Sequence, residues 1–272
     1  MLLGGTHAPN DVLCEDVLLE LFQYFYVDEL FYTFDGVINN FSSLLTICNV
    51  ALHVRNVNTN FRKHILPYIQ PKNVLSIRIP NMYQMASVDL SQFKCLGLLV
   101  LHNVTDHNWP RNLPLNIKSL IVHVRSKHRN KVLKKALALD SIQRLEFNST
   151  CLHFDKSNEA LRKPSRVKQL IFNSQRCFID YTFLLINMPD LQLLKANQLF
   201  YPHRLDSNRL RFSELHTLDL ICKHLDIDEM ISLVKNVAAC SLRQCRLVNI
   251  TNSLSSTIAV ILISCYSPDF HR

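Results

Sequence analysis

Large apolar residues recur through most of the chain in the order L-x-x-L-x-L, where L is any aliphatic or aromatic residue and, in two copies, Ala or Cys. The copies are Val74-Ile77-Ile79, Leu96-Leu99-Leu101, Ile117-Leu120-Val122, Ile142-Leu145-Phe147, Val167-Leu170-Phe172, Leu191-Leu194-Ala196, Leu215-Leu218-Leu220 and Leu242-Cys245-Leu247. Their first residues lie 22, 21, 25, 25, 24, 24 and 27 positions apart. Alternation within a copy is the period of a strand that buries one face. The near-constant interval predicts a repeat with one short strand per copy; the alternative is an ordinary α/β domain with irregularly spaced strands.

The template and its interval resemble those of leucine-rich-repeat proteins. The segments after the strands, such as Asn130–Leu139 and Asp226–Val237, favour helical or irregular returns. The resemblance implies an α/β solenoid of about eight short parallel strands, in which each unit is covered by its neighbours. The family uses an asparagine near the strand end to hydrogen-bond the turn, and the matching residues are Asn81, Asn103, Asn148 and Asn173.

Residues between the template positions are expected to point away from the core, because successive side chains of a strand alternate between its faces. This polar row predicts a surface for binding a target protein, although solubility alone would also produce it. Its members are Arg78, His102, His123, Glu146, Asn148, Asn173, Lys195, Asn197, Asp219 and Arg246.

The N-terminal segment has a helical period instead. Within Leu13–Phe25, apolar residues at i, i+1, i+4, i+5 and i+8 predict one apolar helix face. A second short helix is predicted from an N-cap at Asp28 to Phe34, and Gly36 separates it from a third apolar segment. Three such helices cannot bury all their Leu and Phe side chains among themselves, so they either pack on the rest of the chain or dock on another protein.

The run from Leu13 to Leu45 resembles an F-box, with E-x-x-x-L-x-x-L spacing in the first helix, D-E-L at 28–30 and an aromatic residue, Phe41, in the third. The family's opening Leu-Pro is Leu13-Cys14 here, which removes a helix-starting proline. The resemblance implies a non-catalytic substrate receptor of an SCF-type cullin-RING ubiquitin ligase, which reaches the cullin through a Skp-type adaptor. The expected adaptor contacts are Leu13, Val17, Leu18, Leu21, Phe22, Leu30, Phe34 and Phe41.

Charge separates the same two parts of the chain. The first 54 residues hold seven acidic residues and no Lys or Arg, a formal charge of −7, so the remainder carries +15 of the total of +8. The +15 favours an acidic or phosphorylated target. We therefore expect an F-box-like module at 10–48, a connecting helix at 49–72 (Val54–Ile69, closed by Pro71), the repeats at 73–250, and a cap or truncated array at 251–272.

Several classes of site are not expected. With four glycines in the chain, no glycine-rich phosphate loop, dinucleotide fingerprint or nucleophile elbow is found. The nine cysteines and twelve histidines lack metal-ligand spacing, so we expect no metal, no cofactor and no enzymatic activity, although a Cys/His nucleophile pair stays open. The N-terminus lacks the basic and apolar regions of a signal peptide, and no apolar run is long enough to cross a membrane, so the expected compartment is the cytosol or the nucleus.

Two other functions remain open. The basic cluster Val124–Lys135 would suit nucleic acid, but it is confined to one repeat and lacks interleaved aromatic residues. A leucine-rich-repeat scaffold without a ligase role is the other alternative, and Cys14 in place of proline favours it.

Overall fold

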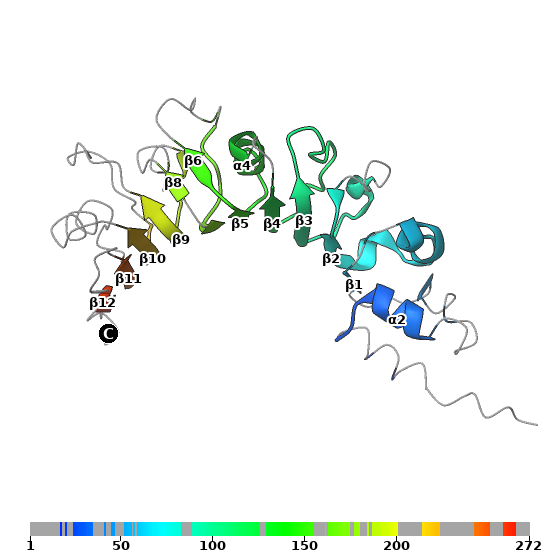
Figure 1. Cartoon of the computed structure of the whole chain (residues 1–272). Coiled ribbons are helices and arrows are strands. Elements are labelled where there is room, and N and C mark those ends of the chain that lie inside the picture. Colours follow the sequence, from blue (N-terminus) through cyan, green and yellow to red (C-terminus); the bar gives the residue numbers. More distant parts are fainter. Residues whose placement is uncertain are drawn as a thin grey trace, which may run out of the picture. The chain divides into compact units, whose positions relative to one another are not determined.

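The fold is α/β (Figure 1). The chain divides into two compact units. The first comprises Met1–Leu101 and Pro110–Ile117, and the second comprises His102–Trp109 and Lys118–Arg272. The computed structural model describes residues 17, 20, 24–34, 41, 45–46, 52–55, 57, 59–82, 89–125, 129–154, 161, 163–174, 177–179, 184, 187–200, 214–223, 242–250 and 258–264. None of the helices within these ranges is long and apolar enough to cross a membrane.

The second unit is built on parallel strands that lie side by side in chain order (Figure 1). They are β4 (Ser119–Val124), β5 (Arg144–Ser149), β7 (Gln169–Ser174), β9 (Leu193–Phe200), β10 (Thr217–Lys223) and β11 (Gln244–Ile250). The short strands β6 (Leu152–Phe154) and β8 (Cys177–Ile179) form a further parallel ladder with β9. Helix α4 (Arg129–Leu137) follows β4, as the sequence predicted for Asn130–Leu139. One strand per repeat, each beside its predecessor, is the arrangement of a solenoid.

A recurring backbone contact fixes the register of these repeats. The carbonyl of Lys118 accepts the N–H groups of Gln143 and Arg144, both at 2.9 Å. The carbonyl one repeat later accepts the next pair of N–H groups, and the series of accepting residues is Lys118, Gln143, Lys168, Gln192 and His216. Because each acceptor lies directly after the first template residue, the sequence interval translates into a constant structural step.

The core consists of the template residues themselves. Each of the template positions, in both units, is at most 6% exposed, and most are at 0%. Phe147 and Phe172 occupy paired positions on β5 and β7 and are among the largest fully buried side chains. The predicted inward face of the repeats is therefore confirmed.

The first unit contains helix α2 (Val27–Phe34), strand β1 (Leu52–Val54), the short helices η1 (Phe61–Ile65), η2 (Leu66–Tyr68), η3 (Pro71–Asn73) and η5 (Leu90–Gln92), and strands β2 (Val74–Ile79) and β3 (Leu98–Val104). Strands β1, β2 and β3 pair in parallel. The predicted connecting helix was wrong at its start, because Val54 ends a strand. Leu52 and Val54 point into the core with His53 between them, and the helical turns begin only near Phe61.

At the other end, the strand β12 (Ile258–Ser264) pairs with β11 in the antiparallel sense over its whole length. Its reversed direction ends the series of parallel strands. Of the two alternatives for 251–272, a cap and a truncated array, this pairing favours the cap, because a capping element covers the last open edge of a solenoid.

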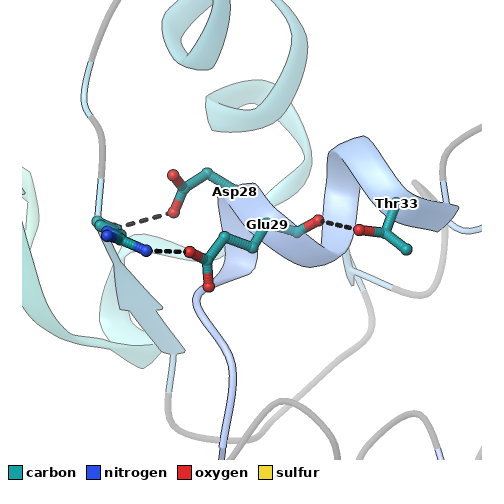
Figure 2. Close-up of polar contacts among 4 residues, drawn as sticks. Asp28, Glu29 and Thr33 are labelled. Carbon is teal, nitrogen blue, oxygen red and sulfur yellow. Dashed lines mark hydrogen bonds and ion pairs between the residues drawn. The ribbon is translucent and has the colours of Figure 1, made fainter.

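Helix α2 begins one residue earlier than predicted, at Val27, so Asp28 lies inside the helix and is not its N-cap. The buried Asp28 carboxylate instead accepts the backbone N–H of Arg55 at 2.9 Å (Figure 2). Glu29 forms an ion pair with the Arg55 guanidinium, and its carbonyl accepts the hydroxyl of Thr33 at 2.8 Å (Figure 2). Burial raises the pKa of the Asp28 carboxyl above its ordinary value of 3.8, and the Arg55 N–H opposes that rise only in part.

Replacing Asp28 by Asn is expected to increase the free energy of unfolding at pH 7 by up to about 1 kcal/mol, because the amide keeps an oxygen for the Arg55 N–H without the cost of a buried charge. The raised pKa means that the native state binds the proton more tightly than the unfolded chain, so wild-type stability falls as pH rises above 3.8. The advantage of Asp28→Asn should accordingly vanish in acid. Asp28→Ala, which leaves the N–H without its acceptor, should cost about 1–3 kcal/mol. Urea unfolding of the three proteins across pH measures both differences.

Candidate functional site

The outward face of the second unit presents one residue of each strand in a continuous row. These residues are paired neighbours across β4, β5, β7, β9, β10 and β11, and we call them the outer row. They are Ile121, Glu146, Ile171, Lys195, Asp219 and Arg246. Arg246 is exposed and the others are half-buried. The alternation of each strand turns these side chains away from the template residues, as the sequence predicted.

Glu146 organises a group of amide side chains on this face. Its Oε1 accepts Asn173 Nδ2 at 2.9 Å and Asn148 Nδ2 at 3.3 Å, and its Oε2 lies 3.9 Å from Arg144 Nη2. The two asparagines are paired neighbours on β5 and β7. Hydrogen bonds to a carboxylate are stronger than those between neutral groups, so Glu146 holds both amides in place.

Two histidines extend this group toward β3. The rings of His102 and His123 stack at a centroid distance of 4.0 Å with 8° between their planes. His123 Nε2 lies 3.4 Å from Asn148 Nδ2. The contact is a hydrogen bond from the Asn148 amide in the tautomer of His123 whose Nε2 carries no proton. Five of the predicted target-binding residues therefore form one contiguous polar surface. They are His102, His123, Glu146, Asn148 and Asn173.

The remaining charges of the outer row compensate one another. Asp219 Oδ2 lies 3.3 Å from Lys195 Nζ, and its Oδ1 lies 3.8 Å from Arg246 Nε. Exposed pairs of this kind contribute about 0–1 kcal/mol each, so their main effect is to neutralise the face. The outer row thus offers apolar side chains and compensated charges, and amide and imidazole side chains lie beside it.

This face also contains residues that were not predicted from the sequence. Ile121 and Ile171 flank Glu146 in the outer row, and as apolar residues they did not belong to the predicted polar row. Their place between two template residues is the signal that would have identified them. Of the other predicted residues, Arg78 is exposed on β2 in the first unit, and Asn197 lies on β9 with its side chain outside the described residues.

The expected role of the asparagines in the turns was wrong for two of them. Asn148 and Asn173 bond the Glu146 carboxylate on the sheet face. Counted from the first template residue of its repeat, each of them comes one residue earlier than Asn81 and Asn103 do in theirs. This difference of one residue puts their side chains on the outward side of their strands. Asn103 lies near the end of β3, where its φ is 56° and its carbonyl accepts Asn108 Nδ2 at 3.1 Å.

The predicted adaptor contacts fall into three groups. Leu13, Leu18, Leu21 and Phe22 lie outside the described residues. Leu30 and Phe41 are buried in the first unit, at 4% and 1% exposure, so as placed they pack in the chain's own core. Val17 is 44% exposed and Phe34 is half-buried.

Several large apolar side chains between residues 17 and 32, the range that includes α2, are exposed. Most of the large hydrophobic residues with substantial exposure in the described part of the chain belong to this one segment. They are Val17, Tyr24, Phe25, Tyr26 and Tyr32, which we call the N-terminal apolar surface. Single exposed hydrophobic residues are ordinary, but a group of them within one short segment is typical of a docking surface.

Within the described ranges, no group of three or more His, Cys, Asp or Glu residues could hold a metal ion. The outer row holds its side chains in register across the strands, and the N-terminal apolar surface exposes mainly aromatic residues. Comparison of the chain with protein-family models, with curated proteins and with solved structures finds no match.

Proposed function

We propose that this chain is a substrate-recognition subunit of an SCF-type cullin-RING ubiquitin ligase. In this proposal, the N-terminal segment binds a Skp-type adaptor, which links the chain to a cullin, and the repeat array binds the target protein. The chain itself carries out no chemistry in this role.

The observation that carries the proposal is the repeat architecture itself. Parallel strands in chain order, locked by the recurring carbonyl contacts, hold the outer row on a rigid support. Rigid presentation of side chains lowers the entropy cost of binding a protein partner. The half-buried polar and apolar residues of the outer row are suited to the same task.

The N-terminal segment supports the adaptor part of the proposal. It carries a charge of −7, it resembles an F-box between Leu13 and Leu45, and the N-terminal apolar surface lies within it. Val17 and Phe25 are both exposed. The sequence predicts both on one apolar helix face, and such a face is the form in which a helix docks on another protein.

Ubiquitination would then depend on proximity. A receptor that holds a target on one module and the ligase on another raises the effective concentration of target lysines near the ubiquitin-charged enzyme. The receptor needs two binding surfaces and a fixed connection for this, and no nucleophile of its own.

The test is binding of the full chain to a purified Skp-type adaptor, beside the double variant Val17→Asp/Phe25→Asp. Both side chains are exposed, so the variant should fold while its adaptor affinity falls about tenfold or more, the loss typical of charged groups placed in an apolar interface. Leu115→Asp, at an 87% exposed leucine of the same unit, is the matched control and should bind like the wild type.

Two results would contradict the proposal. A folded wild-type chain that fails to bind the adaptor would leave a repeat scaffold without a ligase role. Equal weakening by Leu115→Asp would mean that added negative charge, and not the N-terminal apolar surface, governs binding.

A further inference from the structure

A second row of side chains runs along the N-terminal ends of the strands in the second unit. Each member directly follows the first template residue of its repeat, and each is joined to the next by the recurring backbone hydrogen bonds. The members are Lys118, Gln143, Lys168, Gln192, His216 and Arg243, which we call the edge strip. Gln192 and His216 are half-buried, and the others are exposed.

The edge strip has a uniform chemistry. Every side chain in it carries an N–H donor, and none is a carboxylate. The row beside it, at the next position of each repeat, contains no carboxylate either: Ser119, Arg144, Gln169, Leu193, Thr217 and Gln244. Two adjacent rows across the same strands therefore contain cationic, amide, imidazole, hydroxyl and apolar side chains, and no acidic one.

This chemistry differs from that of the outer row, where each cation has an acidic neighbour. Lys118, Lys168 and Arg243 have no ion-pair partner among the residues that the structure describes. Two exposed acidic residues lie near the strip: Asp190, two residues before Gln192, and Glu214, two residues before His216. In each case a buried leucine separates the acid from the strip residue. In the repeat of Lys168 the equivalent position is occupied by a basic residue, Arg166. Positive charge is thus concentrated along the edge strip.

We propose that the edge strip binds an extended acidic segment of the target protein. The proposal rests on the array's proposed role as target receptor and specifies the chemistry of that target. Strands lie about 4.8 Å apart, so Lys118 and Lys168, two strands apart, are separated by about 10 Å. A segment in polyproline II conformation has three residues per turn and a rise of about 3.1 Å per residue, so carboxylates at every third residue would lie on one side about 9 Å apart and would meet Lys118 and Lys168. The glutamine amides between the cations would donate to the segment's backbone carbonyls.

The composition of the strip favours a peptide over a nucleic acid. Single-stranded nucleic acids are held by aromatic side chains that stack on the bases, and neither row contains Phe, Tyr or Trp. The glutamines alternate with the lysines from Lys118 to Gln192, and amides of this kind suit a peptide backbone.

The probe is a fluorescent peptide with Glu at every third residue and Ser or Thr between, which avoids helix formation. Its matched control has Gln in place of each Glu. Fluorescence anisotropy with the full wild-type chain should detect binding of the Glu peptide only. Lys118→Glu/Lys168→Glu should weaken that binding about tenfold or more, since two attractions become repulsions. Lys72→Glu/Lys94→Glu, which makes the same change of net charge at exposed lysines of the first unit, should leave it nearly unchanged.

Three results would overturn the inference. The first is no binding of the Glu peptide, and the second is an equal loss of peptide affinity in both double variants. The third is displacement of the peptide by a single-stranded oligonucleotide that binds more tightly than the peptide and whose binding depends on Lys118 and Lys168. None of these would affect adaptor binding. Failure of the edge strip and failure of the proposed ligase role are therefore distinguished by pairing this assay with the adaptor assay.

Discussion

Replacing Phe147 with Ala is expected to lower the free energy of unfolding of the second unit by about 3–5 kcal/mol. The ring is fully buried, and its position on β5 pairs with Phe172 on β7. In a solenoid each repeat is covered only by its neighbours, so the cavity would lie at the contact that joins two repeats. Natural domains are stable by only about 5–15 kcal/mol, so a loss of this size would expose much of the unit to unfolding.

Ile171→Ala is the matched control, because Ile171 lies on the adjacent strand but in the outer row, where it is half-buried. Truncation of the Ile171 side chain should lower the free energy of unfolding by about 1 kcal/mol. Urea unfolding followed by circular dichroism, together with hydrogen exchange of the amides of β5 and β7, measures both variants. Equal destabilisation by the two would contradict the assignment of inward and outward faces.

The repeat core could be predicted from the sequence because burial selects every template residue in the same way. Alternation of apolar residues within each copy, together with a near-constant interval between copies, is compatible with few folds other than one strand per repeat. Even the weakest matches to the template, Ala196 and Cys245, are buried. The segment of α4 was predicted only as a helical or irregular return. In the structure it is a helix, and its Val132, Leu133, Ala136 and Leu137 are buried at helical spacing.

The first unit was predicted less well because its elements are short. Strand β1 has three residues, too few to show a period, and a helix was expected across it. Asp28 is a residue type that often caps the N-terminus of a helix, but here a tertiary contact uses its side chain instead. The carboxylate accepts the backbone N–H of Arg55, 27 residues away in the sequence. Local sequence carries no signal of such a contact.

The functional surfaces were predicted only in part. The sequence identified the polar members of the outer row, yet the total of +15 gave no indication of where positive charge would be free. That depends on which side chains meet across strands. Lys195 and Arg246 lie beside Asp219 and are neutralised, whereas Lys118 and Lys168 stand among glutamines.

Replacing Phe41 with Ala is expected to destabilise the first unit by about 3–5 kcal/mol. Phe41 is 1% exposed, and its ring centroid lies 6.3 Å from that of Phe31 and 6.0 Å from that of Phe34, distances at which aromatic rings attract one another. Adaptor binding, which we propose for this segment, should be lost together with the fold. Thermal unfolding and adaptor affinity measured on the same samples would show the two losses together.

Phe41→Leu separates a core role from a contact role. Leucine keeps most of the apolar volume, so this variant should cost less than Phe41→Ala and should retain adaptor binding if Phe41 only supports the helix. Val17→Asp should show the reverse, weaker binding at nearly unchanged stability, because Val17 is exposed. If Phe41→Leu instead weakened binding while its unfolding midpoint matched that of the wild type, Phe41 would belong to the docking surface, and its burial in the isolated chain would have to be relieved when the adaptor binds.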